Sequence, residues 1–262
     1  MSDFTDELIE KCVNYCKNIW KDDTAFNLKN KETDAECSIK IEEKTMYVIF
    51  KFSDSKKDWG YNLRFLPTNI EYNNLRFKVH KGFWEQFTSI WKDVLQHMSA
   101  NIDKCDKIII SGFSLGGGLS QIASYLLKAD LTIPFVRPFQ TVIFGAPRTG
   151  NKKFANVFQK QICHIYYNKD PVPSAVPLFL GYDDIDKVFH IKPEDIVSTK
   201  PRTYWESATI ITKIVLKYGL RLSFIDDHWK DHNLEPIIEY FKNKTIETDK
   251  QENTDTEKFL SN

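Results

Sequence analysis

The sequence predicts an α/β fold with a mostly parallel central sheet. Through the middle of the chain, short continuous apolar runs alternate with stretches of helical periodicity, which is typical of a parallel sheet whose connections are helices. Four of the 10 glycines lie between residues 112 and 118, directly behind one of the apolar runs. At 262 residues, the chain is long enough for one large domain with a substantial core.

The N-terminal part is expected to hold two helices and two strands. Apolar residues recur at three- and four-residue steps over residues 3–20 and 82–98, which predicts an amphipathic helix in each range. Residues 38–43 and 44–52 are expected to be strands, since the second range is rich in β-branched and aromatic residues.

The alternation itself begins at residue 107. Residues 107–111 form an apolar run typical of a strand buried on both faces, and a helical pattern follows over 116–129. The chain then predicts, in order, a strand over 141–145, a helix over 151–161 and a strand over 163–168. A capping box at 203–206 opens a long helix to about residue 224, and its two apolar faces predict burial or contact with something apolar.

These elements are expected to form a single domain over residues 1–242. Residues 243–262 are polar, charged and without periodicity, so we expect a disordered tail there. The most apolar region, 207–225, is interrupted by three basic residues. Because no apolar run approaches the roughly 18 residues that a spanning helix needs, no transmembrane segment is expected.

Charge and cysteine content disfavour two further classes. The 36 basic and 36 acidic side chains give a net charge of zero, so no field gathers nucleic acid by counterion release. The 5 cysteines are scattered and too dilute for a disulfide framework. The acidic start of the chain shows no positively charged segment followed by an apolar run. We therefore expect an intracellular, cytoplasmic protein in a reduced setting.

The glycine cluster contains the pattern G-x-S-x-G at residues 112–116. Between a buried strand and a helix, this pattern indicates a nucleophilic serine on a sharp, strained turn. Ser114 is therefore the predicted nucleophile. The alternatives are a glycine-rich turn with an incidental serine and a phosphate-cradling loop, although the Lys-Ser/Thr or G-x-G-x-x-G spacing of such loops is missing.

A serine hydroxyl needs a histidine to take its proton and a carboxylate to orient that histidine. After an elbow of this kind the chain order is serine, carboxylate, histidine, which leaves His228 and His232 as candidate bases. Their i, i+4 spacing also fits a metal pair, but the glutamate that should follow the first histidine is absent. The histidines set aside, two by chain order and two as structural residues of strand-like runs, are His80, His97, His164 and His190.

Asp170 is the favoured carboxylate because it follows a predicted strand, where α/β sheets present their functional loops. A turn aspartate ahead of Pro171 is the alternative interpretation. Asp183 and Asp184 also fit the chain order.

Six motifs in order make the chain resemble the class 3 (fungal-type) lipases of the α/β-hydrolase superfamily over roughly residues 45–240. They are Phe50-Lys-Phe-Ser53 followed by Lys-Asp-Trp59, Val79-His-Lys-Gly-Phe83, Gly112-Phe-Ser-Leu-Gly-Gly117, Phe144-Gly-Ala-Pro-Arg-Thr-Gly150, Asn168-Lys-Asp-Pro-Val-Pro173, and Asp231-His-Asn-Leu with Tyr240 beyond it. The resemblance implies an α/β-hydrolase fold with a nucleophile elbow after a central strand. Phe113 stands where the family has histidine, and Phe50-Lys-Phe stands where it has F-R-G.

By position, the resemblance implies that Ser114 is the nucleophile, Asp170 the orienting acid and His232 the base, with His228 as the alternative base. It also implies an oxyanion hole made by the N–H of Leu115 with the N–H and hydroxyl of Ser53, and a lid that contains Trp59.

The implied activity is hydrolysis of carboxylic esters of lipids through an acyl-enzyme, as in triacylglycerol lipases, with no cofactor or metal. A phospholipase A1 or a short-chain carboxylesterase is the alternative with the same chemistry. A catalytically weak, lipase-like interaction protein is the alternative of another class. Lys213 and Lys217, beside an apolar face of the long helix, fit a transient contact with a lipid surface.

Overall fold

The computed structural model describes residues 4–21, 28–51, 67–158, 161–167, 170–176, 180–185, 188–191, 197–199, 205–209, 212 and 234–244. Its helices are α1 (Asp6–Lys21), α3 (Lys81–Asn101), η2 (Ile102–Lys104), α4 (Leu115–Ala129), α5 (Lys152–Ala155), η3 (Asn156–Phe158) and α6 (Val172–Ala175). Its strands are β1 (Leu28–Lys29), β2 (Glu36–Glu42), β3 (Thr45–Phe50), β4 (Pro67–Tyr72), β5 (Leu75–His80), β6 (Lys107–Phe113), β7 (Phe139–Phe144), β8 (Ile162–Tyr167), β9 (Val188–Ile191) and β10 (Val197–Ser198). Residues 205–209 and 234–244 are also helical.

The described strands form an 8-stranded sheet in the order β1-β2-β3-β6-β7-β8-β9-β10. Strands β3, β6, β7, β8 and β9 run parallel, whereas the pairs nearest the two edges are antiparallel. The expectation of a mostly parallel sheet is therefore confirmed. Strand β6, which leads into the predicted nucleophile, lies between β3 and β7.

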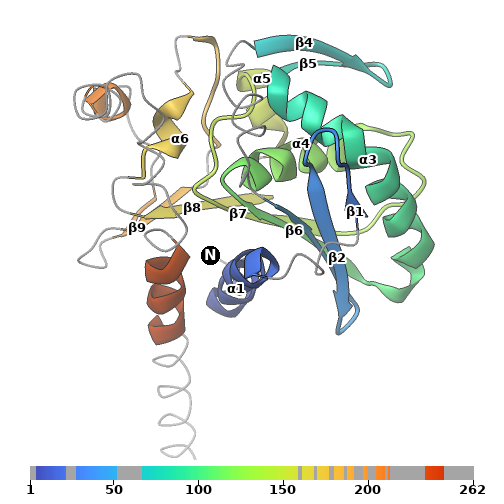
Figure 1. Ribbon diagram of the computed structural model, residues 1–262, viewed down its shortest axis with the longest axis horizontal. Coiled ribbons are helices and arrows are strands. Elements are labelled where there is room, and N and C mark those ends of the chain that lie inside the picture. Colours follow the sequence, from blue (N-terminus) through green and yellow to red (C-terminus); the bar gives the residue numbers. More distant parts are fainter. Residues whose placement is uncertain are drawn as a thin grey trace, which may run out of the picture.

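Helices cover both faces of this sheet. Figure 1 shows α3 and α4 on one side and α1 with the helical segment 234–244 on the other. Ile108 and Ile110 of β6 belong to the core on the α4 side, while Ile109 belongs to the core on the α1 side, because successive side chains of a strand point to opposite faces. This two-sided burial explains the continuous apolar run in the sequence.

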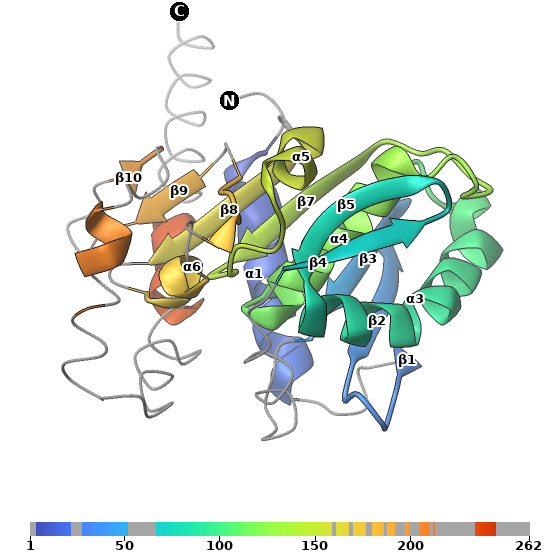
Figure 2. The ribbon, with the colours of Figure 1, turned by 90° about the horizontal axis from the view of Figure 1, so that it is seen from above.

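A hairpin of β4 and β5, which is not among the elements expected from the sequence, forms a separate sheet. Asn73 and Asn74 join its strands with φ values of 44° and 66°, the left-handed conformation that tight hairpin turns need and asparagine tolerates. Figure 2 shows the hairpin lying over α4, and the ring centroids of Phe77 and Tyr125 are 4.4 Å apart. The two asparagines were the overlooked signal.

Two helices differ from their expected ranges. In place of a helix over 151–161, the short helix α5 begins after Asn151, whose side chain accepts the N–H of Phe154 (3.1 Å), and continues as the 3-10 turn η3. Of the long helix expected over 203–224, residues 205–209 and 212 are helical, and the rest lies outside the described residues. The tail expected over 243–262 likewise lies outside them from residue 245 onward. None of the described helices is long and apolar enough to cross a membrane.

All five cysteines are free and buried. Cys12 and Cys16 of α1 face β6, where the Cys16 sulfur lies 3.4 Å from the Ser111 hydroxyl. Burial raises the pKa of the Cys16 thiol to about 12, and it also raises the pKa of Cys12 and Cys37. These side chains therefore behave as small core residues.

The native protein is expected to leave all five thiols unmodified by an aromatic disulfide reagent at about pH 8, because the thiolate is the reacting form. In denaturant, all five thiols of the same sample should react with the reagent, as measured by absorbance. Rapid reaction of any thiol in the folded protein would contradict the burial described above.

Candidate active site

The turn from β6 into α4 holds Ser114 in a strained backbone conformation. Its φ is 55° and its ψ is −122°, a region that residues with side chains rarely adopt. The Ser114 N–H donates to the carbonyl of Phe144 (2.9 Å), and its carbonyl accepts the N–H of Gly118 (3.2 Å). These bonds tie the serine to β7 on one side and to its own helix on the other.

Three glycines make this turn sterically possible. A methyl group at Gly112 would lie 2.3 Å from the carbonyl of Gly116, and one at Gly116 would lie 2.2 Å from the carbonyl oxygen of Phe50. A methyl group at Gly117 would lie 2.5 Å from the Cβ of Ala146. Backbones approach this closely only where the side chain is absent. Strands β6 and β3 and the loop after β7 therefore all close on the first turn of α4.

A buried ion pair fixes the end of β3 beside this turn. The Nζ of Lys51 lies 2.8 Å from Oε2 of Glu36, and the two side chains are only 8% and 3% exposed. The Lys51 N–H also donates to the Glu36 carbonyl (3.0 Å), and Lys29 pairs with the same carboxylate. The lysine that replaces the arginine of the F-R-G motif thus has its own partner on β2.

Asp170 lies just past β8, on the turn that opens α6. Its N–H donates to the carbonyl of Tyr167 (3.0 Å), and its Oδ1 accepts the N–H of Val172 (3.0 Å). The residue is 2% exposed. These bonds fix the carboxyl group at the edge of the sheet.

Ser114 and Asp170 leave the same edge of the sheet. Both follow the carboxyl ends of parallel strands, and β7 separates their strands β6 and β8. Neighbouring strands are about 4.8 Å apart, so these two strands are about 10 Å apart. Leu115 is the first residue of α4. Four predicted site residues lie outside the described residues: Ser53, Trp59, His228 and His232.

The described histidines include two in structural positions. The Nε2 of His164 on β8 accepts the N–H of Ala146 (3.1 Å), as expected for a residue of a strand. The Nδ1 of His80, which is fully buried, accepts the N–H of Phe83 and caps α3 (3.3 Å). Among the described residues, no group of three or more histidine, cysteine, aspartate or glutamate side chains is placed to hold a metal ion.

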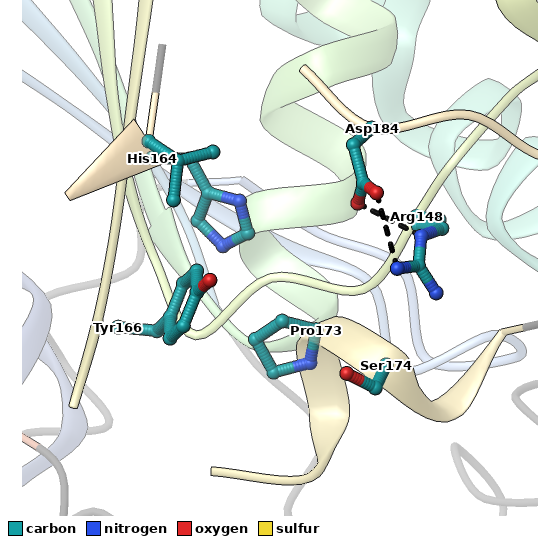
Figure 3. Close-up of a pocket in the computed structure, with 7 residues that line it drawn as sticks. Arg148, His164, Tyr166, Pro173, Ser174 and Asp184 are labelled. Carbon is teal, nitrogen blue, oxygen red and sulfur yellow. Dashed lines mark hydrogen bonds and ion pairs between the residues drawn. The ribbon is translucent and has the colours of Figure 1, made fainter. Parts of the chain in front are cut away.

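A second ion pair, between the buried Arg148 and the partly exposed Asp184, lies beside α6. The Nε and Nη2 of Arg148 reach the two carboxylate oxygens of Asp184 (2.8 and 3.1 Å), and Figure 3 shows this pair next to Ser174 and Pro173. The adjoining cavity, also lined by His164, has a volume of about 10 Å³, which is room for about one water molecule. Asp184, an alternative acid in the sequence, is therefore engaged by an arginine.

These features define a class of protein. A mostly parallel sheet with a strained serine between a central strand and a helix, and an aspartate after a later strand at the same edge, is the arrangement of an α/β-hydrolase. Residues 47–180 match the family described as Lipase (class 3). Since this match covers slightly more than half of the sequence, the chain belongs to the class 3 lipase family.

Several curated proteins are similar over part of their length. Secreted mono- and diacylglycerol lipase 1 of Fusarium solani is 32% identical over 113 residues, which is 40% of this chain and 31% of that protein. Phospholipase A1 PLIP2, chloroplastic, of Arabidopsis thaliana is 30% identical over 39% of this chain and 15% of its own. Secreted lipase MDL2 of Malassezia globosa is 29% identical over 52% of this chain and 44% of its own. The chain thus spans less than half the length of these relatives.

Solved fungal lipases share the fold. The Rhizomucor miehei lipase propeptide complex superimposes with a TM-score of 0.61 at 20% identity, over 78% of this chain and 74% of that chain. The lipase of Rhizopus microsporus var. chinensis superimposes with a TM-score of 0.57 at 23% identity, over 79% and 84%.

The expectation of an intracellular, cytoplasmic protein is wrong in the light of these relatives. Those from Fusarium solani and Malassezia are secreted lipases, and the plant relatives are chloroplastic. The expectation depended on the acidic first residues and on the scattered cysteines. Neither feature follows from the fold that this chain shares with its relatives. Buried thiols occupy ordinary core positions here, so their number carries no information about the compartment.

Two residues of the site region were not singled out from the sequence. Arg148 appeared only as one letter of the F-G-x-P-R-x-G motif, although a charged residue inside an otherwise apolar and small motif was a usable signal. Glu36 gave no signal, because its partner Lys51 is distant in sequence and the pairing depends on the register of β2 and β3.

Replacement of Gly116 by alanine is expected to destabilise the protein by about 3 kcal/mol or more and to abolish activity, because the new methyl group meets a backbone carbonyl that cannot move. Gly118→Ala is the matched control: its methyl group would lie 3.0 Å from the Phe83 ring, a side-chain contact that needs a shift of only a few tenths of an ångström, and alanine favours the helix by about 1 kcal/mol. Denaturant unfolding and ester hydrolysis measure both effects. Equal stability of the two variants would contradict the close contact between Gly116 and the Phe50 carbonyl.

Glu36→Gln is expected to destabilise the protein by about 3 to 5 kcal/mol, because it leaves the buried Lys51 without its charge partner. The control is Glu71→Gln, which breaks the Glu71–Arg76 pair where both side chains are exposed (73% and 79%) and should change stability by less than about 0.5 kcal/mol. Urea denaturation compares the two. A Glu36→Gln variant as stable as this control would contradict the buried Lys51–Glu36 ion pair.

Proposed function

We propose that this protein hydrolyses carboxylic esters of lipids and that Ser114 is its nucleophile. The observation that carries the proposal is the φ of 55° at Ser114, at the junction of β6 and α4. Such strain costs about 1 to 3 kcal/mol and is concentrated at functional sites. Membership of the class 3 lipase family supports a carboxylic ester hydrolase as the class of enzyme.

In the proposed reaction, the Ser114 hydroxyl attacks the ester carbonyl while His232 takes its proton. His232 then gives this proton to the departing alcohol, and an acyl-enzyme remains. A water molecule, deprotonated by His232, attacks the acyl carbon. His232 then returns the proton to the Ser114 oxygen as the fatty acid is released. Asp170 orients the imidazole and stabilises its protonated form. The burial of Asp170 (2% exposed) and its place at the sheet edge of Ser114 support this role, and His228 is the alternative base.

The negative oxygen that forms on the substrate needs two donors, since removal of one typically costs about 2.7 to 4 kcal/mol of barrier. Leu115 begins α4, where N–H groups have no acceptor within the helix, so its N–H is the first proposed donor. The second is Ser53, only three residues beyond Phe50. The carbonyl of Phe50 lies at the elbow beside Gly116, which supports this choice.

The proposed substrates are acylglycerols, because relatives from Fusarium solani and Malassezia globosa are mono- and diacylglycerol lipases. Phospholipids are the second candidate class, since Arabidopsis relatives are phospholipases A1. A transient contact with a lipid surface fits Trp205, whose side chain is 77% exposed, and Trp59 is the proposed lid residue. A catalytically weak interaction protein is the competing function.

A fluorophosphonate probe tests the nucleophile. The wild type is expected to be labelled and Ser114→Ala is expected to stay unlabelled, with hydrolysis of an activated ester reduced about 10⁴-fold or more. His232→Ala and Asp170→Asn should reduce turnover by a similar factor, whereas His228→Ala should retain most of it. An unlabelled wild type, or equal labelling of Ser114→Ala, would favour the interaction protein over the enzyme.

The substrate class is tested by comparing the turnover of several esters by the same purified protein. Diacylglycerols, phosphatidylcholine and soluble short-chain esters, each supplied below and above the concentration at which aggregates form, distinguish a lipase, a phospholipase A1 and a carboxylesterase. Turnover confined to dissolved short-chain esters would contradict a lipid substrate.

A further inference from the structure

Arg148 is a buried cation that contacts three separate segments of the chain. Its Nε and Nη2 bind Asp184, its Nη1 donates to the carbonyl of Val176 (3.0 Å), and its Nη2 also donates to the Ser207 hydroxyl (3.2 Å). The side chain is 2% exposed. A planar guanidinium presents donors in a fixed fork, and a lysine ammonium does not. Its place in the fold therefore requires arginine rather than positive charge alone.

The Val176 carbonyl ends the turn that Asp170 begins. Val176 is the C-cap of α6, Oδ1 of Asp170 accepts the N–H of Val172 (3.0 Å) at its start, and the N–H of Ser174 donates to Pro171 (3.0 Å). Proline at positions 171 and 173 fixes two φ angles of this segment. The segment is thus short and stiff, so a bond to its last carbonyl constrains the direction of the carboxyl group at its first residue.

The backbone around Arg148 is held to the nucleophile's helix. The Gln121 side chain of α4 donates to the carbonyl of Pro147 (3.2 Å), and the hydroxyl of Thr149 donates to the same carbonyl (3.2 Å). Gly117, in the first turn of α4, leaves no space for a methyl group between itself and Ala146. The loop that carries Arg148 therefore keeps a fixed position relative to Ser114, the N-cap of α4.

We propose that Arg148 is a positioning residue that sets the place of Asp170 relative to Ser114. Arg148 joins the loop held on α4 to the Val176 carbonyl, the last of the turn that carries Asp170. Asp184 holds the guanidinium in the plane that this bond requires, and Figure 3 shows the Arg148–Asp184 pair. Arg148 acts without touching the substrate. The inference rests on the proposed roles of Ser114 and Asp170.

The test compares Arg148→Lys in two backgrounds, the wild type and Asp170→Ala, by the rate at which a fluorophosphonate labels Ser114 and by the pH dependence of that rate. In the wild type, Arg148→Lys is expected to slow labelling about 10- to 100-fold, since small displacements of catalytic groups have effects of this size. The pKa on the acid side of the profile should fall, because a displaced carboxylate stabilises the imidazolium less. In Asp170→Ala, the same substitution should change the rate less than about twofold, because two residues that act through one step are not additive.

Arg137→Lys is the matched control, since that arginine is partly exposed and its pair with Asp103 is long (3.7 Å); its labelling rate should equal that of the wild type. Asp184→Asn, which weakens the hold on the guanidinium, provides the same two-background test if Arg148→Lys does not fold. Equal slowing in both backgrounds, or slowing with an unchanged pH profile, would overturn the positioning role while the proposed function stands. An unlabelled wild type would overturn the proposed function itself.

Discussion

The close contact between the first turn of α4 and the end of β3 is the constraint on which the rest of the site depends. The carbonyl oxygen of Phe50 would lie 2.2 Å from a methyl group at Gly116, so the strand that leads toward Ser53 and the helix that starts at Ser114 meet through backbone alone. No side chain can adjust at such a contact. The relative position of the two segments is therefore set by the parallel pairing of β3 with β6, which is part of the central sheet.

Buried charge then fixes the segments around this contact. Two ion pairs, Lys51–Glu36 and Arg148–Asp184, each have an almost fully buried basic side chain. Each pair joins two segments at the carboxyl edge of the sheet. A buried pair adds little net stability compared with apolar packing, but loss of one member is costly. Such pairs therefore act mainly as geometric restraints, which is the property that a catalytic arrangement needs.

The sequence predicted the parts of the fold whose signals are local. The apolar run of β6, the glycines of the elbow and the helical period of α3 each reflect the surroundings of neighbouring residues, and the structure confirms them. The β4–β5 hairpin was overlooked because its signal is only the pair Asn73-Asn74. The partners of Lys51 and Arg148 could not be predicted from the sequence. Glu36 is distant in sequence from Lys51, and Asp184 is distant from Arg148, so each pair meets only in the folded chain. The catalytic roles of Ser114, Asp170 and His232 stay predictions. The cytoplasmic location was wrong because composition does not determine compartment.

The strained serine also bears on the order in which the protein matures. Helix α4 has local hydrogen bonds and can form early, but Ser114 reaches its positive φ only when Phe144 of β7 accepts its N–H and β3 is paired beside Gly116. These contacts join residues far apart along the chain, and contacts of this kind form late because their loop-closure entropy must first be overcome. A chain in which α4 has formed but the sheet has not would therefore lack the strained conformation of Ser114. Under the proposed role of Ser114, the geometry needed for hydrolysis is therefore complete only when β3, β6 and β7 are paired.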